Sequence, residues 1–318
     1  MRRVIIDTDT ASDDVVAIIM ALKSKEIHIE AITTVAGNCN VDLATLNALM
    51  TLEITDTYYP PVYKGASKPL YRDLVTATDV HGEDGMGDCD LVHPIRTHQS
   101  GNAVDKIIEI VKAYPNEIEI AVIGPATNIA LAIQKDPKTM SLVKHIYSMG
   151  TGGFGPGNVT PVAEYNVYVD AESYDIMLRS GIQITIIGFD LCLGPAALIE
   201  KEMDFLLASN KKEAVFAIEC NKTLREFNLK IGNGVQIDLP DPLAMAVLLW
   251  DDIVIESVKS FSYTCTKEDI TYGQVVIHPE GSEVIQTHKK FIEPSNTIVC
   301  RTIDSRLFKQ RMIDLLIK

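Results

Sequence analysis

Short runs of β-branched residues alternate with helix-patterned segments over the first two thirds of the chain. The expected strands cover residues 4–6, 27–35, 118–123, 145–149 and 183–187, and the expected helices cover residues 13–22, 41–53, 103–113, 128–134 and 171–179. Such alternation predicts βαβ units, because two parallel strands need a crossover connection that a helix usually supplies. The sequence therefore predicts an α/β fold: an open, mostly parallel, doubly wound (Rossmann-like) sheet with helices on both faces.

The last third of the chain has a different pattern. Residues 196–230 are expected to be helical, residues 253–302 to form shorter strands, some antiparallel (270–277 for example), and residues 308–317 to form a closing helix. No repeats, low-complexity tracts or Pro/Ser-rich linkers interrupt the sequence. These patterns predict a single domain over residues 1–318, with extra C-terminal strands beside the parallel ones.

Acidic residues are concentrated near the N-terminus, between an expected strand and an expected helix. They are Asp7, Asp9, Asp13 and Asp14. Like charges about 4 Å apart repel by ~1 kcal/mol in water and by several times more in a shielded site. A hard cation that prefers oxygen ligands, Ca²⁺ or Mg²⁺, would offset that repulsion. Alternatively, Asp13 and Asp14 only cap the helix, although capping does not explain the two acids at the strand end.

Polar and glycine residues also follow the later strands. Gly37 and Asn38 come after the second expected strand, residues 124–128 come after the third, and Met149 ends the fourth. Ligands of open α/β sheets bind beyond the carboxyl ends of the strands. Segments far apart along the chain are therefore expected to converge with the aspartates on one crevice.

Composition restricts the class of partner. The net charge of −14 repels nucleic-acid polymers and anionic membranes, so a metal site or a neutral small molecule fits better. Six cysteines without a C-x-x-C pair indicate reduced thiols in a cytoplasmic protein. The apolar stretch before Asp7 is too short for the core of a signal peptide, and no apolar run approaches the ~20 residues that span a bilayer.

The acidic run resembles the start of the nucleoside hydrolase family, whose signature is Asp-x-Asp-Pro-Gly-x-Asp-Asp. All four acids match, and Thr10-Ala11 stand where the family has Pro-Gly. Further segments resemble the family in the same order: Val35-Ala-Gly-Asn38, His81-Gly-Glu-Asp-Gly85, Gly124-Pro-Ala-Thr127-Asn128, Ala163-Glu-Tyr-Asn166 and Asp241-Pro-Leu-Ala244. Ordered matches that extend from residue 7 to residue 244 make this resemblance specific.

The resemblance implies a calcium-dependent N-ribohydrolase that cleaves ribonucleosides into free base and ribose, and a homodimer or homotetramer. It implies that Ca²⁺ is held by Asp9, Asp14, Asp241 and the backbone carbonyl of Thr127, with Asp7 supporting these ligands from outside. It also implies that Asp9 is the general base on a calcium-bound water. The residues assigned to the substrate are Asp13, Asn38, His81, Met149, Asn158, Glu164 and Asn166, and His81 and Asn166 are assigned to catalysis as well.

The residue types suit this chemistry on their own. Cleavage of an N-glycosidic bond gives the ribose oxocarbenium character, and a carboxylate can both take a proton from the attacking water and favour nearby positive charge. Asparagine and glutamate side chains can bind ribose hydroxyls. One-step attack by water, as in inverting glycosidases, is the expected course.

The base end of the substrate is less defined. Many family members carry a histidine just before the Asp-Pro-Leu motif, which is thought to help protonate the departing base, and Pro240 occupies that position here. Proline cannot donate a proton, so activation of the leaving group must come from His81, from a group such as Asp238 or Tyr165, from stacking or from solvent. A modified nucleoside or another N-riboside is therefore an alternative substrate.

Three other functions are alternatives for the same sequence. An Mg²⁺ phosphohydrolase would use Asp7-x-Asp9, but it requires Thr or Val where Ala11 stands. A non-catalytic, calcium-dependent ribose-binding protein would not need a base at Asp9. The G-x-G-x-x-G run from Gly150 to Gly155 imitates a dinucleotide site, but prolines and glycines follow it, which indicates a loop in place of the required helix.

Overall fold

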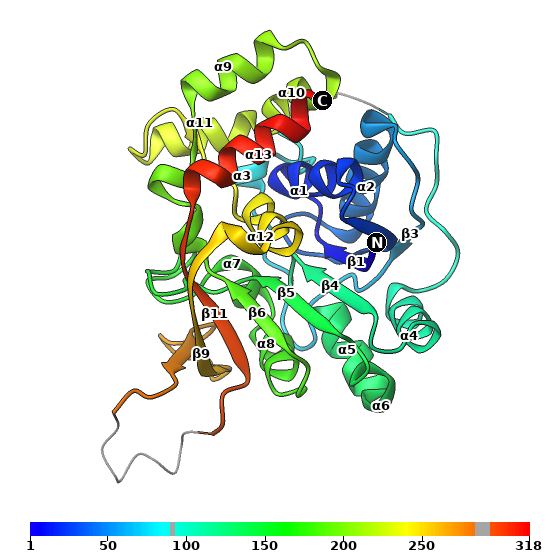
Figure 1. Ribbon diagram of the computed structural model, residues 1–318, viewed down its shortest axis with the longest axis vertical. Helices are drawn as coiled ribbons and strands as arrows, with labels where there is room; N and C mark the ends of the chain where they lie inside the picture. Colours follow the sequence, from blue (N-terminus) through cyan, green and yellow to red (C-terminus); the bar gives the residue numbers. More distant parts are fainter. Residues whose placement is uncertain (90–92, 284–292) are drawn as a thin grey trace.

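The central sheet has nine strands in the order β10-β9-β11-β6-β5-β4-β1-β2-β3 in a computed structural model that describes residues 1–89, 93–283 and 293–318 (Figure 1). The strands are β1 (Arg2–Thr8), β2 (Ile27–Thr34), β3 (Val62–Lys64), β4 (Ile118–Val122), β5 (His145–Met149), β6 (Ile184–Ile187), β9 (Val254–Thr264), β10 (Val275–Pro279) and β11 (Thr297–Ile303). Every pairing from β3 across to β11 is parallel, whereas β9 runs antiparallel to β11 and to β10. The predicted mostly parallel α/β sheet with extra C-terminal strands is confirmed.

Helices cover both faces of the sheet (Figure 1). They are α1 (Ser12–Lys23), α2 (Val41–Thr55), α3 (Thr78–His81), α4 (Ala103–Ala113), α5 (Thr127–Lys135), α6 (Pro137–Met140), α7 (Tyr165–Val169), α8 (Ala171–Leu178), α9 (Glu200–Ala208), α10 (Lys212–Glu219), α11 (Lys222–Lys230), α12 (Pro240–Leu249) and α13 (Ser305–Ile317). Successive side chains of a strand point to opposite faces. Val4 and Ile6 of β1 therefore join the core formed with α1 and α12, whereas Ile5 joins the core formed with α4, α5 and α8.

Helix α1 is enclosed on almost every side. Each of its residues from Ser12 to Leu22 is buried, and it packs against α2, α10, α12 and α13. A helix that is apolar all round needs such an environment. Its position fixes the acidic first turn of the helix, with Asp13 and Asp14, inside the protein next to the end of β1.

Two differences from the expected elements concern the edges of the sheet. The three-residue strand β3 is missing from the predicted strands, because so short a segment gives little alternation to recognise. The strand expected over 270–277 begins only at Val275. Gly273, with φ of 78°, lies against Tyr168 in a turn just before it.

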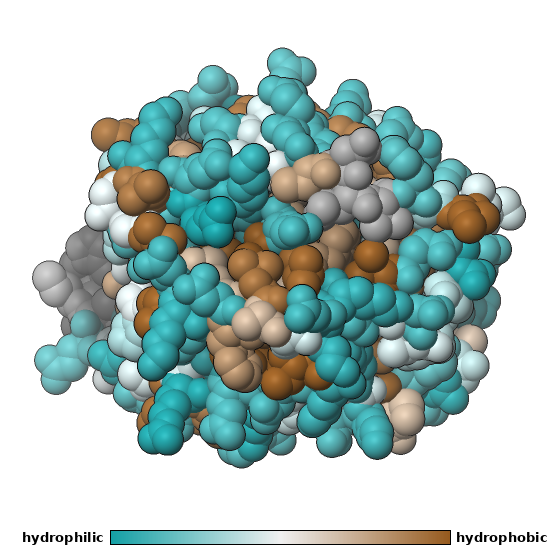
Figure 2. Space-filling view, turned by 90° about the horizontal axis from the view of Figure 1, so that it is seen from above, coloured by the Kyte–Doolittle hydropathy of each residue, from teal (hydrophilic) through white to brown (hydrophobic). Residues whose placement is uncertain are grey.

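The surface is mostly hydrophilic on the face drawn in Figure 2, with hydrophobic side chains gathered near its centre. All six cysteines are free thiols, as the sequence predicted. No helix in the described part of the chain is both long enough and apolar enough to cross a membrane.

Candidate active site

A cavity of about 340 Å³ brings together most of the predicted substrate-binding residues, although they come from distant parts of the chain. Its lining includes Asp13, Asn38, His81, Met149, Asn158, Glu164, Asn166 and Asp241. The remaining predicted site residues, Asp7, Asp9, Asp14 and Thr127, do not line the cavity and are fully buried. The parallel sheet explains the convergence, because Asp9 follows β1, Asn38 follows β2 and Met149 ends β5.

Asp9 is held between two glycines. A Cβ atom added to Gly37 would lie 2.1 Å from Asp9 Oδ2, and one added to Gly124 would lie 2.7 Å from Asp9 Oδ1. The backbone N–H of Asn38 donates to Asp9 Oδ2 at 2.5 Å, whereas the buried Oδ1 has no hydrogen-bond partner. Burial, together with the nearby charge of Asp13, raises the pKa of Asp9 to about 7 against the opposing Asn38 hydrogen bond.

Asp14 closes the turn between β1 and α1. Its Oδ2 accepts a hydrogen bond from the Ala11 backbone N–H at 2.8 Å, and its Oδ1 accepts one from the Thr8 hydroxyl at 2.5 Å. The Thr8 hydroxyl also lies 3.0 Å from that of Thr10. Asp14 therefore caps α1, as the alternative interpretation proposed, but Asp13 makes no such cap and its Oδ1 has no hydrogen-bond partner.

Asp13, Asp14 and Asp241 form a cluster of buried carboxylates. One oxygen from each lies within 4.8 Å of the others, which is a suitable arrangement for a shared cation. Asp241 reaches the cluster from the first turn of α12. Burial and the neighbouring carboxylates raise the pKa of Asp14 and of Asp241 well above the usual range. An all-oxygen donor set with unpartnered atoms fits a hard cation such as Ca²⁺ or Mg²⁺.

Asp7 and Thr127 are tied into the surrounding structure. Asp7 Oδ1 accepts hydrogen bonds from the Thr33 hydroxyl at 2.5 Å and from Asn128 Nδ2 at 2.8 Å. The Thr127 hydroxyl donates to Asp170 at 2.7 Å. These contacts connect β1, β2 and the start of α5, and they hold the chain segments that carry Asp9 and Thr127 in a fixed relation.

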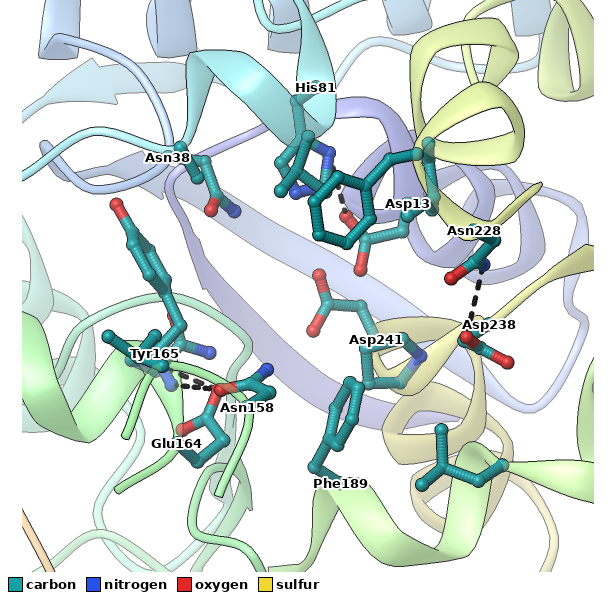
Figure 3. A pocket seen from close by; sticks show the side chains of 18 of the residues that line it. Asp13, Asn38, His81, Asn158, Glu164, Tyr165, Phe189, Asn228, Asp238 and Asp241 are labelled. Atoms are coloured by element: carbon teal, nitrogen blue, oxygen red, sulfur yellow. Dashed lines mark hydrogen bonds and ion pairs between the residues drawn. The ribbon is translucent and has the colours of Figure 1, made fainter. Parts of the chain in front are cut away.

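The polar residues on one side of the cavity surround Glu164 (Figure 3). Glu164 precedes α7 and accepts hydrogen bonds from the backbone N–H groups of Asn166 at 3.1 Å and Thr151 at 3.1 Å. Asn158 Oδ1 accepts one from the Tyr165 N–H at 2.9 Å, and Asn166 Oδ1 is buried without a partner. Burial raises the pKa of Glu164 to about 7. These groups leave several polar atoms available to a hydroxyl-rich ligand.

His81 lies at the end of α3, across the cavity from Glu164 (Figure 3). Its Nδ1 is 2.8 Å from the Ser12 hydroxyl and 3.9 Å from Asp13 Oδ1. Burial lowers the pKa of His81, although the charge of Asp13 opposes this effect. His81 is therefore neutral near pH 7 unless a ligand changes its surroundings.

The opposite end of the cavity contains residues that the sequence interpretation did not assign to the site. They are Phe189, Leu193, Leu224, Phe227, Asn228, Ile231 and Asn233, beside Asp238 and Pro240. Leu224, Phe227, Asn228 and Ile231 recur at helical spacing along and just after α11, a pattern that also marks an ordinary buried face. Trp250 is not among the lining residues and packs against the core. Residues 150–155 form no helix, which confirms the loop interpretation of the glycine run.

Comparison with known proteins identifies the family. The model of the inosine-uridine preferring nucleoside hydrolase family matches residues 4–310. An uncharacterised protein, C1683.06c, of Schizosaccharomyces pombe is 42% identical over 319 residues, covering 99% of this chain and 98% of the relative. Uridine nucleosidase 1 of Arabidopsis thaliana is 35% identical over 253 residues, covering 79% of this chain and 75% of the relative.

A solved structure agrees with these matches. The plant nucleoside hydrolase PpNRh1 superposes with a TM-score of 0.92 at 29% identity, covering 99% of this chain and 98% of that one. Family, relatives and structure are thus consistent over nearly the whole chain, and the relatives that carry a functional name are N-ribohydrolases. The chain belongs to the nucleoside hydrolase family, whose enzymes act on N-glycosyl compounds.

Proposed function

We propose that this protein is a Ca²⁺-dependent hydrolase that cleaves the N-glycosidic bond of ribonucleosides into free base and ribose, with Asp9 as the general base. The observation that carries the proposal is a group of buried carboxylates, some of whose oxygens have no partner, next to a cavity lined by polar groups suited to ribose. Membership of the nucleoside hydrolase family supports the reaction class. The homo-oligomer and the cytoplasmic location stay predictions.

The cation would be held by Asp9, Asp14, Asp241 and the Thr127 carbonyl, with Asp13 beside them. The cluster of Asp13, Asp14 and Asp241 supports Asp14 and Asp241 as ligands; it includes Asp13 and does not include Asp9, whose part in the site stays a proposal. Ca²⁺ accepts six to eight oxygen ligands, so several carboxylates and ligand hydroxyls can share it. When bound, calcium would orient the ribose diol and lower the pKa of a water molecule. Its charge would also keep these carboxylates ionised.

Asp9 is suited to take the proton of the attacking water. Its Oδ2 is occupied by the Asn38 N–H, whereas Oδ1 is left to accept a proton, and the two glycines fix the carboxylate in place. Positioned bases typically contribute about 10²–10⁴-fold to the rate. One-step attack leaves no covalent intermediate, which is consistent with the single base assigned here.

The side of the cavity around Glu164 would bind the ribose. Asn38, Asn158 and Glu164 can exchange hydrogen bonds with its hydroxyls, and Met149 can cover an apolar part of the sugar. Asn166 offers an unpartnered carbonyl oxygen, Oδ1. An acceptor at that position would favour the positive charge that develops on the ribose during cleavage.

His81 is the group that we assign to the leaving base. If the Ser12 hydroxyl donates to Nδ1, the neutral ring carries its proton on Nε2 and can donate it. Pro240 lines the same cavity and offers no proton, so His81 has no histidine partner there. A hydrogen bond from this N–H to the departing base suits the neutral ring, whereas transfer of a proton to the base would require the ring to be protonated on both nitrogens first.

Ribose release from a panel of purine, pyrimidine and nicotinamide ribosides tests the function. We expect release with Ca²⁺ present and its loss with a chelator. Asp9→Asn should lower kcat by at least about 10²-fold while ribose-containing inhibitors still bind, because it removes the base and keeps the shape. Chelator-resistant release would contradict the calcium requirement, and unchanged turnover of the variant would contradict the role of Asp9.

Gly37→Ala tests whether Asp9 must be held in place. The added methyl group would overlap Asp9 Oδ2, so the carboxylate or the end of β2 must move. We expect a cost of about 1–3 kcal/mol in unfolding free energy and a fall in kcat of about tenfold or more. Gly181→Ala is the control. Gly181 has a φ of 78°, which strains an alanine backbone, but no atom lies within 4 Å of the added Cβ. It should lower stability and retain turnover, and equal turnover in both variants would contradict the account.

His81→Ala tests the leaving-group assignment. Natural nucleosides have poor leaving groups, so their kcat should fall much further than that of p-nitrophenyl riboside, whose leaving group needs no proton. Steady-state kinetics on both substrates provide the comparison. An equal loss on the two substrates would show that His81 acts on the fold or on the sugar.

A further inference from the structure

The cavity has a second end, on the far side of Asp241 from Glu164 (Figure 3). The lining of the cavity also includes the apolar side chains of Phe189, Leu193, Leu224, Phe227 and Ile231. The polar side chains of Asn228 and Asp238 lie across Asp241 from Glu164 and Asn158 (Figure 3). Apolar walls can accept the faces of any heterocyclic base, so the few polar groups decide which base is oriented correctly.

Asp238 is held in a fixed orientation by two amides. Asn228 Nδ2 donates to Asp238 Oδ2 at 3.1 Å, and Gln236 Nε2 donates to Asp238 Oδ1 at 3.0 Å. The Asp238 residue is only 5% exposed although it lines the cavity. Each carboxylate oxygen can accept more than one hydrogen bond, so both oxygens keep acceptor capacity.

The same contacts use the donors of Asn228. Its Nδ2 also lies 3.2 Å from the Gln236 backbone oxygen, so each of its two hydrogens has an acceptor. Reversal of the amide would place Asn228 Oδ1 against a carboxylate and a carbonyl, which is unfavourable. Oδ1 therefore points elsewhere, with only a long 3.5 Å contact from Asn233 Nδ2. Asn228 and Asp238 can therefore offer a ligand only hydrogen-bond acceptors, their side-chain oxygens.

We propose that Asp238, positioned by Asn228 and Gln236, is a specificity-determining residue that selects ribonucleosides whose base offers an N–H donor on the edge remote from the ribose. This inference rests on the proposed function, because it assigns the second end of the same cavity to the base. Exocyclic amino groups and ring N–H groups satisfy the requirement, as in the recognition of cytosine amino groups by carboxylates. A base that bears a carboxylate on that edge would be repelled.

The hydrogen bonds favour recognition over proton donation by Asp238. Both amides donate to it, which stabilises the charged carboxylate and opposes the rise in the pKa of Asp238 that burial causes. An acid that protonates the base would need a proton on one of these oxygens. The two amide contacts therefore favour a binding role for Asp238.

The test compares pairs of substrates that differ by one amino group. The pairs are cytidine with pyrimidin-2-one riboside, and adenosine with purine riboside. In the parent protein, loss of the amino group should lower kcat/KM by at least about tenfold, because the remaining acceptor capacity of the Asp238 carboxylate then has no donor from the base. In Asp238→Asn this ratio should collapse toward one, because the carboxamide can donate to the ring nitrogen that both members of each pair share and no longer depends on the amino group.

Asp204→Asn is the matched control, since Asp204 is an exposed aspartate on α9, away from the cavity lining. It should keep the parent ratios. Equal kcat/KM for both members of each pair in the parent protein would overturn the inference without any variant. A folded Asp238→Asn protein that keeps the parent ratio of kcat/KM would overturn it as well. A loss that is equal for all natural ribosides but spares p-nitrophenyl riboside would make Asp238 the acid and would also overturn it.

Failure of the proposed function gives a different result. If the parent cleaves none of these ribosides, the dissociation constants of the same intact pairs are measured by calorimetry with Ca²⁺ present. Tighter binding of cytidine than of pyrimidin-2-one riboside, abolished by Asp238→Asn, would support the selection in a protein that does not hydrolyse. Equal affinities would refute the selection as well.

Discussion

Mutual repulsion among buried carboxylates at the junction of β1 and α1 is the constraint on which the site depends. Helix α1 is enclosed by four other helices and the sheet, so its acidic first turn is reached only from the cavity that Asp13 lines. Backbone N–H groups and threonine hydroxyls satisfy some oxygens, but Asp9 Oδ1 and Asp13 Oδ1 keep no partner. Isolated charges of this kind are too costly to bury. A cation shared by the carboxylates would offset this cost, which is the basis of the proposed calcium site.

The topology of the sheet explains how residues from distant parts of the chain meet at the site. Parallel strands deliver Asp9, Asn38 and Met149 to one edge, and α12 adds Asp241 from late in the chain. Glu164 and Asn158 lie on one side of Asp241 and Asn228 and Asp238 on the other (Figure 3), and apolar side chains complete the lining of the cavity. In the proposed binding mode the hydroxyl-rich sugar lies beside Glu164 and the flat base beside Asp238. The bond between them would then lie close to the carboxylates.

Much of the fold was accessible from the sequence, because β-branched runs and buried helices give clear periodic patterns. The parallel strands β1, β2, β4, β5 and β6 were predicted close to their observed positions. The residues that we assign to the base of the substrate were not predicted, since Phe227 and Asn228 lie on α11 at spacings that any packed helix shows. Likewise, spacing alone could not show that Asp14 both caps α1 and belongs to the carboxylate cluster, whereas Asp13 belongs to the cluster without capping the helix. That distinction depends on how the turn at Thr8 folds.

Calorimetric titration of the chelator-treated protein with Ca²⁺ near pH 6, in two buffers of different ionisation enthalpy, tests the central claim most directly. Burial raises the pKa of Asp9 to about 7 and that of Asp14 and Asp241 well above the usual range, so carboxylates of the cation-free protein hold protons at that pH. A cation that binds them must displace protons. The account predicts saturable binding with release of roughly one proton or more per ion. Binding without proton release, or no binding at all, would contradict it.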